Sequence, residues 1–395
     1  MKIKLIGVGA AGNKAVIEAV EQGVVDKESI LLLNSTLQDI PVQYRDPKTA
    51  VCFSSKENSG GCGKEPKIAE GLIMEALQNG SVNLDGLMEP DDRYAVIVTS
   101  SEGGSGCGAS TVIAKYLSQV LDVHVHMIVF TGFEEDARGL QNTVHYFQNL
   151  DIGYTIQVIS NKKFFKGNKL KAEREANAEF VKKLSVLLCN NLIESDQNMD
   201  ETDQIKLTTT PGFMVIEARE LDKIKSVEQF NQICYDMITN SSSLDFEPSA
   251  IRLGIVLNVT DKTKEYIDYT FGAIKERMGL PYEIYTHVQY DKNPEYIEII
   301  AAGLKMPEED IDRIYKKYQE ETSKINKKKD SFFGNSQNMK FDESDEVFNL
   351  GSTKKTDFKN VSQEDKDRFF KVMEKAKATV AQNKAKFFNT VKSDL

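Results

Sequence analysis

Residues 101–108 read Ser101-Glu102-Gly103-Gly104-Ser105-Gly106-Cys107-Gly108, and they separate the apolar run Tyr94–Thr99 from a helix expected to begin near Ala109. An ordinary strand-to-helix turn needs one or two small residues, whereas five of the six residues from Gly103 to Gly108 are glycine or serine. Such a run lets several backbone amides point at one anion. The segment has no G-K-[ST] sequence, so amides and a helix dipole, not a lysine, would attract the anion. The stretch predicts a phosphate cradle.

A second glycine motif lies near the start of the chain. Gly7-Val8-Gly9-Ala10-Ala11-Gly12 fits G-x-G-x-x-G, directly after the apolar run Lys2–Ile6 and before a helical segment. Taken alone, the motif is typical of a dinucleotide-binding fold, which expects an acid about 20 residues further on to hold the ribose. This chain has Asn34-Ser35-Thr36 at that place. An NAD(P)-dependent dehydrogenase is therefore the less favoured interpretation of this motif.

Strand-like and helix-like segments alternate through the first half of the chain. Buried, Val/Ile-rich strands separated by amphipathic helices predict an α/β fold with a Rossmann-like, doubly wound parallel sheet that carries helices on both faces. The expected strands are Lys2–Ile6, Ile30–Leu33, Ala50–Phe53, Tyr94–Thr99, Val123–Phe130 and Tyr154–Ile159.

The second half of the chain is expected to form a separate, smaller α/β domain with a mixed sheet. Apolar residues at helical spacing predict one long central helix over 171–194 in front of it. The last two strands of this domain are expected to be neighbours, joined by the turn Asp291-Lys292-Asn293-Pro294. The expected strands are Phe213–Ala218, Ile251–Val259, Glu283–Val288 and Tyr296–Ala301, with helices near 226–240 and 262–278.

Composition sets the expected domain boundaries. Residues 329–361 are rich in Lys, Asp, Ser and Asn and poor in apolar residues, which is typical of a flexible linker. Apolar residues recur at helical spacing after the linker. The expected parts are a nucleotide-binding domain over 1–170, the central helix within 171–195, the second domain over 196–305, a charged helix over 306–328, the linker, and an amphipathic tail helix over 362–392.

The glycine-rich segment resembles the signature of a known family. Gly103-Gly104-Ser105-Gly106-Cys107-Gly108 is similar to G-G-G-[TS]-G-[TS]-G of the tubulin/FtsZ superfamily of GTPases, and the chain looks most like TubZ-type plasmid and phage proteins. The resemblance covers about residues 1–305. Glu102 replaces the first glycine, and an acid there should point away from a triphosphate or meet Mg²⁺. Cys107 replaces a hydroxyl residue and is expected to be a small packing residue, the alternative being a reactive thiol with a lowered pKa.

The resemblance implies that the chain binds GTP and GDP with Mg²⁺. It assigns the ribose to Glu134, a further nucleotide contact to Arg138, and the guanine edge to Asn161 and Asn177. Asn suits guanine because its amide offers a donor and an acceptor together. The residues that the resemblance assigns to the nucleotide are Gly9, Ala10, Ala11, Gly12, Asn13, Asn34, Gly61, Gly63, Gly103, Gly104, Ser105, Gly106, Cys107, Glu134, Arg138, Asn161 and Asn177.

A later acidic segment resembles the family's N-x-D-x-x-D loop. The resemblance implies catalytic roles for Asn198, Asp200 and Asp203, although Ser195 stands where the family has glycine. Asp200 and Asp203 could also simply cap a helix. The loop follows a helix expected to be about 36 Å long, so we expect these carboxylates at the opposite pole from the nucleotide. In a head-to-tail filament they would meet the γ-phosphate of the neighbouring copy.

Charge bears on the expected partners. A formal charge of −10 disfavours direct nucleic-acid binding by the body of the chain. No apolar run reaches the ~20 residues of a membrane-spanning helix, no secretory leader is evident, and the five scattered cysteines suit a cytoplasmic protein. Residues 361–395 hold eight basic and five acidic side chains together with four phenylalanines. This tail is expected to contact a DNA-bound adaptor, a neighbouring subunit or an anionic membrane surface.

The resemblance implies a function. We expect GTP-dependent assembly into dynamic head-to-tail homopolymers, with hydrolysis activated by assembly, in plasmid or phage DNA segregation or positioning. An FtsZ-like division-ring protein is the alternative. A non-polymerising GTP-binding paralogue and the dehydrogenase remain as further hypotheses.

Overall fold

The computed structural model describes residues 3–54, 61–88, 93–189, 192, 198–290 and 294–333, with side chains up to residue 326. The chain divides into two compact units, 1–317 and 318–395. The first unit contains all the strands: β1 (Lys4–Val8), β2 (Ile30–Asn34), β3 (Ala50–Cys52), β4 (Tyr94–Ser100), β5 (His124–Thr131), β6 (Thr155–Ser160), β7 (Gly212–Glu220), β8 (Arg252–Val259), β9 (Glu283–Tyr290) and β10 (Tyr296–Leu304).

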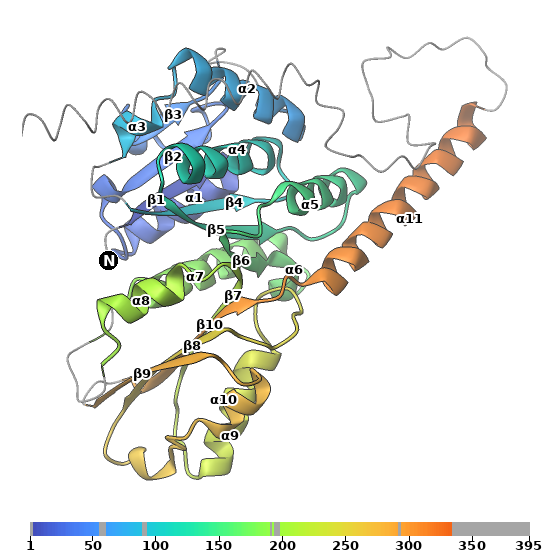
Figure 1. Cartoon of the computed structure of the whole chain (residues 1–395). Helices are drawn as coiled ribbons and strands as arrows, with labels where there is room; N and C mark the ends of the chain where they lie inside the picture. Colours follow the sequence, from blue (N-terminus) through green and yellow to red (C-terminus); the bar gives the residue numbers. More distant parts are fainter. Residues whose placement is uncertain are drawn as a thin grey trace, which may run out of the picture. The chain divides into compact units, whose positions relative to one another are not determined.

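These strands form one ten-stranded sheet in the order β3-β2-β1-β4-β5-β6-β7-β10-β8-β9 (Figure 1). Strands β1 to β6 pair in parallel, and β7 continues this parallel sheet by pairing with β6. Strand β10 is antiparallel to both β7 and β8, which makes the second half a mixed sheet. The predicted parallel and mixed parts are therefore confirmed, and they are joined edge to edge.

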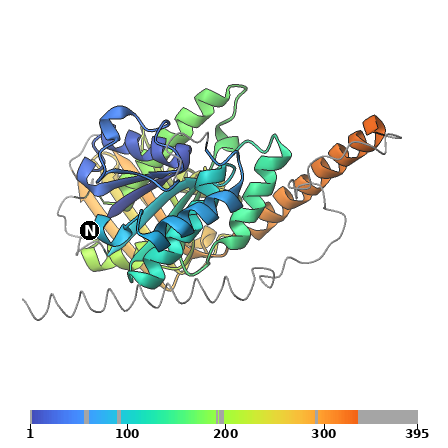
Figure 2. The same ribbon diagram turned by 90° about the horizontal axis from the view of Figure 1, so that it is seen from above.

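Helices cover both faces of the sheet, as predicted (Figures 1 and 2). One buried apolar cluster lies under α2, α4, α5, α9 and α10, and a second lies on the opposite face under α1, α7 and α8. The helices are α1 (Gly9–Glu21), α2 (Pro66–Asn79), α3 (Leu84–Leu87), α4 (Gly104–Val120), α5 (Ala137–Asn149), α6 (Asn161–Phe164), α7 (Lys169–Leu187), α8 (Glu201–Thr208), α9 (Val227–Thr239), α10 (Gly272–Arg277) and α11 (Glu308–Phe333).

The expected pairing of the last two strands is wrong. Strand β9 pairs in parallel with β8, and β8 lies between β9 and β10. Burial explains the order: β10 is buried along most of its length, whereas the first four residues of β9 are only half-buried. A strand that is apolar on both faces is stabilised by neighbours on both sides, and the half-buried strand takes the edge.

Two helix predictions also differ from the structure. The central helix α7 covers Lys169–Leu187 and so ends before the expected residue 194. The expected helix over 262–278 is broken into a 3-10 turn at Lys264–Tyr266 and the short α10. Phe271, directly before α10, has a φ of 52°, a left-handed conformation that interrupts a helix.

The structure describes only part of the C-terminal region for which helices and a linker were predicted. Helix α11 begins close to the expected residue 306 and continues to Phe333. The rest of the predicted linker and the predicted tail helix lie outside the described residues. No helix in the described part of the chain has the length and apolar character needed to cross a bilayer.

Candidate functional site

A cavity of about 320 Å³ lies where β1, β2 and β4 end. The last residues of these three strands, Val8, Asn34 and Ser100, all line it. Ligands of open α/β sheets bind outside the carboxyl ends of the strands, so this is the expected place for a site. The other lining residues are Gly9, Ala10, Ala11, Ser35, Thr36, Gln38, Asp39, Gly61, Gly103, Gly104, Ser105 and Gly106.

Two helices begin at this cavity without a side-chain cap. Helix α1 follows Val8 and α4 follows Gly103, and neither of these residues accepts a hydrogen bond from its helix through a side chain. In contrast, α5, α7, α8 and α9 are each capped by an Asp, Asn or Ser side chain. The first N–H groups of an uncapped helix are free to bind an anion, and the helix dipole adds attraction. The cavity therefore has the character of a phosphate site.

The start of α4 differs from the sequence prediction. The helix begins at Gly104, five residues before the expected Ala109. The glycine-rich residues from Gly104 onward therefore form the first turn of α4 instead of a loop before it. A Cβ atom on Gly106 would lie 2.7 Å from Thr99 Oγ1 and 3.0 Å from the Val8 carbonyl oxygen. Glycine is needed here because the first turn of α4 packs against the ends of β1 and β4. This packing brings the two glycine motifs together at the cavity.

Some residues assigned to the nucleotide hold the framework instead of lining the cavity. Gly12 lies against β4, where a Cβ atom would be 2.1 Å from the Val98 carbonyl oxygen. Asn13 is fully buried and donates from Nδ2 to the Leu33 carbonyl oxygen at 3.3 Å, which ties α1 to β2. Gly63 and Cys107 are also absent from the cavity lining.

Six lining residues were not assigned to the nucleotide from the sequence. Ser35 and Ser105 share a hydrogen bond of 2.8 Å between their hydroxyl groups, which links the end of β2 to the first turn of α4. Asp39 is exposed and brings a carboxylate to the cavity, while its Oδ2 accepts a hydrogen bond from Asn34 Nδ2 at 3.3 Å. The six residues are Val8, Ser35, Thr36, Gln38, Asp39 and Ser100. Four of them follow Asn34 closely in the sequence, whereas Val8 lies within the first glycine motif and Ser100 directly precedes the second glycine-rich segment.

Glu102 points away from the cavity, which is one of the two outcomes expected for an acid at this place. Its carboxylate fills the space above Gly132 and Gly139, and its Oε1 accepts a hydrogen bond from the Glu134 backbone N–H at 3.2 Å. Burial raises the pKa of this carboxyl group. Its charge is therefore kept out of the phosphate site.

Cys107 is a packing residue. Its side chain is 1% exposed and its Sγ donates to the Asn142 carbonyl oxygen at 3.3 Å. Burial raises the pKa of the thiol well above its usual range. The alternative of a reactive thiol, which required a lowered pKa at the helix N-terminus, is therefore wrong.

Glu134, the residue assigned to the ribose, is engaged by three cations and does not line the cavity. Arg313 donates from both terminal nitrogens, at 2.8 Å each, and Lys162 and Lys317 also pair with the carboxylate. Burial would raise the pKa of this group, but the hydrogen bonds from Arg313 and Lys162 outweigh burial and lower it to about 2. Arg138 pairs with Glu65 and also lies outside the cavity lining.

The two asparagines assigned to guanine lie on different elements. Asn161 is the first residue of α6, directly after β6, and Asn177 is half-buried on α7. The Asn161 Oδ1 atom is buried and has no hydrogen-bond partner among the described residues. Neither asparagine lines the phosphate cavity.

The acidic pair to which the resemblance assigns catalysis forms a helix cap. Asp200 Oδ1 accepts from the Asp203 N–H at 2.9 Å and Asp203 Oδ2 accepts from the Asp200 N–H at 3.4 Å, which is a capping box at the start of α8. Thr155, the first residue of β6, donates to carbonyl oxygens at the other end of α8. Asp200, Asp203 and the exposed Asn198 do not line the phosphate cavity of their own chain. Ser195 lies outside the described residues.

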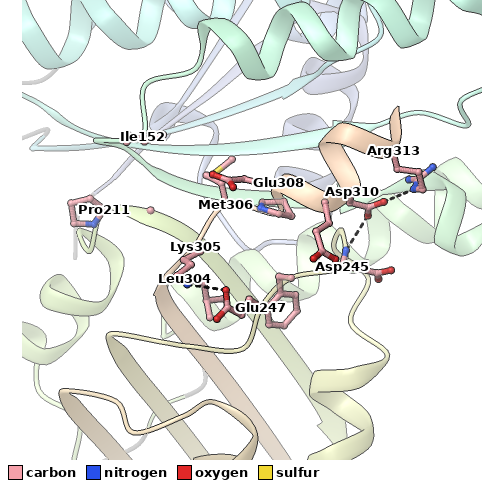
Figure 3. Close-up of a pocket in the computed structure, with 14 residues that line it drawn as sticks. Ile152, Pro211, Asp245, Glu247, Leu304, Lys305, Met306, Glu308, Asp310 and Arg313 are labelled. Atoms are coloured by element: carbon pink, nitrogen blue, oxygen red, sulfur yellow. Dashed lines mark hydrogen bonds and ion pairs between the residues drawn. The ribbon is translucent and has the colours of Figure 1, made fainter. Parts of the chain in front are cut away.

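A larger cavity, of about 880 Å³, lies at the first turns of α11 (Figure 3). Figure 3 shows Asp310 between Arg313 and the backbone of Asp245. The Asp310 carboxylate accepts from Arg313 Nε at 2.6 Å and from the Asp245 N–H at 3.0 Å. None of the residues assigned to nucleotide or catalysis lines this cavity. Arg313, which lines this cavity, also binds Glu134.

Comparisons with known proteins agree with this geometry. Residues 2–169 match the GTPase domain of the Tubulin/FtsZ family. The chain is 30% identical over 146 residues to the tubulin-like protein CetZ2 of Haloferax volcanii, an alignment that covers 35% of this chain and 39% of CetZ2. The chain matches only about two fifths of the length of the curated relatives.

Solved structures extend the likeness to most of the chain. A GTPγS-bound protofilament of CetZ2 from Haloferax volcanii superposes with a TM-score of 0.67 at 18% identity, covering 82% of this chain and 100% of CetZ2. TubZ of Clostridium botulinum phage c-st, truncated at its C-terminal tail, has a TM-score of 0.64 at 17% identity, covering 82% and 98%. The fold of most of this chain is therefore similar to the fold of these proteins.

Proposed function

Residues 2–169 of this chain match the GTPase domain of the Tubulin/FtsZ family, and from this premise we propose that the protein binds GTP, assembles head to tail and hydrolyses GTP within the filament. The observation that carries the proposal is the meeting of two uncapped helix N-termini, those of α1 and α4, at one cavity. Backbone amides from both helices would hold the phosphates. Asn161 and Asn177 would bind the guanine edge, and Arg138 and Glu134 would add contacts to the nucleotide.

Mg²⁺ fits this cavity together with a triphosphate. The described residues contain no group of three acidic, His or Cys side chains that could hold a metal ion. Asp39 and the Ser35 and Ser105 hydroxyl groups offer oxygen ligands at the cavity, and Mg²⁺ commonly takes one or two such protein ligands beside phosphate oxygens. When bound, Mg²⁺ would neutralise charge on the β- and γ-phosphates.

The hydrolytic site would be completed by a second copy of the chain. Asp200 and Asp203 are oriented by the capping box, but they do not reach the cavity of their own chain. A head-to-tail contact would bring them to the γ-phosphate of the next copy, where they would orient the attacking water. A heterologous contact that does not close into a ring gives a filament. Phosphate loss would then weaken the contact between copies.

The test is the dependence of turnover on protein concentration. We expect the GTP hydrolysis rate per chain to rise steeply above a threshold concentration, at which filaments appear by electron microscopy with GTP or a slowly hydrolysed analogue. GDP should give few filaments. Equal turnover per chain in a dilute sample that is shown to be monomeric would contradict hydrolysis at a shared site.

We further propose that the filaments segregate or position plasmid or phage DNA in the cytoplasm. The acidic body of the chain favours indirect attachment, through a DNA-bound adaptor on the C-terminal tail. In cells that carry the gene, a fluorescent fusion should form moving filaments that track labelled plasmid or phage DNA. A static ring at the division site would instead favour the division-ring alternative.

A further inference from the structure

Lys183 is a buried cation in the middle of the protein. It lies on α7, its side chain is 1% exposed, and its Nζ lies 2.8 Å from Glu217 Oε1 and 3.6 Å from Glu179 Oε1. A fully buried lysine is rare unless a carboxylate neutralises it. Glu217, on β7, is the nearer partner, and the two residues join the central helix to the mixed half of the sheet.

The same oxygen of Glu217 holds a loop that follows α9. Ser241 donates from its hydroxyl group to Glu217 Oε1 at 2.6 Å, and the Ser242 backbone N–H donates to it at 3.3 Å. Ser241 is 1% exposed. One half-buried oxygen therefore accepts from α7 and from the loop over residues 241–242, and the position of the loop depends on the charge pair.

The loop in turn holds the end of β6. Pairing of β6 with β7 stops at Gln157 and Met214, so Ser160, the last residue of β6, has no partner on β7. Its backbone N–H donates instead to the Ser242 carbonyl oxygen at 2.9 Å. Asn161 follows Ser160 directly. Glu217 is thus linked to Asn161 through Ser242 and Ser160.

Glu217 is also linked to the second asparagine. Lys183 lies six residues after Asn177 on the same helix, which is about 9 Å along its axis. A buried pair with Glu217 therefore fixes the axial position of the helix that carries Asn177. Both asparagines assigned to the guanine edge are held by contacts that meet at one carboxylate.

We infer that Glu217 is a positioning residue for base recognition, which sets the relation of Asn161 to Asn177 through Lys183 and Ser241. The inference rests on the proposed function, because it takes GTP as the ligand of this site. It adds that selectivity for guanine depends on the mixed half of the sheet, whereas triphosphate binding depends on the glycine motifs alone. Base recognition and phosphate binding can therefore be tested separately. A substitution of Glu217 should reduce discrimination between bases and leave phosphate binding intact.

The test compares the affinities for GTP and for inosine triphosphate, which lacks the 2-amino group of guanine. The double variant Lys183→Met with Glu217→Gln removes both buried charges at once, so neither is left unpaired. Ser241→Ala removes one hydrogen bond and keeps the charge pair, which makes it the milder second variant. The matched control is Lys171→Met with Glu175→Gln, the same change at a more exposed pair on α7. Circular dichroism confirms that each protein is folded.

We expect the preference for GTP over inosine triphosphate to fall by about five- to tenfold in the double variant and in Ser241→Ala. The control should keep the preference of the unaltered protein, and Asn161→Ala should lose it. If both test variants keep the preference and Asn161→Ala loses it, the inferred role of Glu217 is overturned, whereas the proposed function is not. If the unaltered protein does not bind GTP at all, the proposed function itself fails.

Discussion

Arg313 donates to both carboxylate oxygens of Glu134, at 2.8 Å each, although the two residues are 179 positions apart in the chain. Glu134 is 7% exposed, so this bidentate pair anchors the first turns of α11 to the loop after β5. The residue that the family resemblance assigns to the ribose is thus already bound by a guanidinium. A ribose would compete with Arg313 for this carboxylate.

We expect Arg313→Ala to destabilise the protein by about 1–2 kcal/mol, less than the usual cost of breaking a buried pair, because Lys162 and Lys317 remain beside Glu134. Urea unfolding measures this loss. Lys305→Ala, which removes an exposed pair with Glu247, is the control and should change stability by less than about 0.5 kcal/mol. If Glu134 also binds the ribose, Arg313→Ala should tighten GTP binding; an unchanged affinity would make the pair purely structural.

Stability in acid should depend on Glu134. Its pKa is lowered to about 2 in the folded protein, below the ordinary value of about 4.3 in an unfolded chain. A lowered pKa stabilises the fold above the unfolded value, and this contribution is lost as the pH falls from about 4.5 toward 2. The difference in unfolding free energy between the unaltered protein and Glu134→Gln should therefore shrink between pH 5 and pH 3. A constant difference would show that folding does not lower the pKa of this carboxyl group.

Asp200→Asn should separate capping from catalysis. Asparagine caps a helix about as well as aspartate, so we expect thermal stability to be nearly unchanged. The charge is lost, and GTP turnover in the filament should fall by about 10²-fold or more, with GTP affinity unaltered. Glu201→Gln removes a neighbouring exposed charge of α8 and should keep normal turnover. Full turnover in Asp200→Asn would exclude this carboxylate from the hydrolytic step.

Gly106→Ala should weaken the phosphate site. A Cβ atom there would press on Thr99 Oγ1 and the Val8 carbonyl oxygen, so the first turn of α4 must shift and GTP affinity should fall by at least about tenfold. Gly71→Ala is the matched control, since nothing lies within 4 Å of its added Cβ on the exposed side of α2. This control should raise stability by about 0.5–1 kcal/mol. Isothermal titration with GTP compares the two variants.

The glycine motifs could be interpreted from the sequence because their constraints are local. Gly9 and Gly106 are needed where two strands end and two helices begin. A short stretch of sequence is enough to indicate both the end of a strand and the start of a helix. The same reasoning placed the start of α4 five residues too late, because glycine intrinsically disfavours a helix. Tertiary packing, against Val8 and Thr99 on one side and Pro66 on another, stabilises this first turn.

Contacts between distant segments could not be predicted. Arg313 gave no signal that it would pair with Glu134, and no local pattern showed that β8 would lie between β9 and β10. Asp39 was missed because an exposed aspartate in a loop is ordinary, and its place at the cavity follows only from the path of the chain after β2.

The proposed phosphate site is made of backbone N–H groups at the starts of α1 and α4. Because these donors belong to the main chain, most side-chain substitutions do not remove them. Glutamate at residue 102 and cysteine at residue 107 therefore leave these main-chain donors in place. What selection must preserve is the close approach of two backbones. Proteins that bind an anion through main-chain groups in this way can differ in amino-acid sequence at almost every position and still bind the same anion.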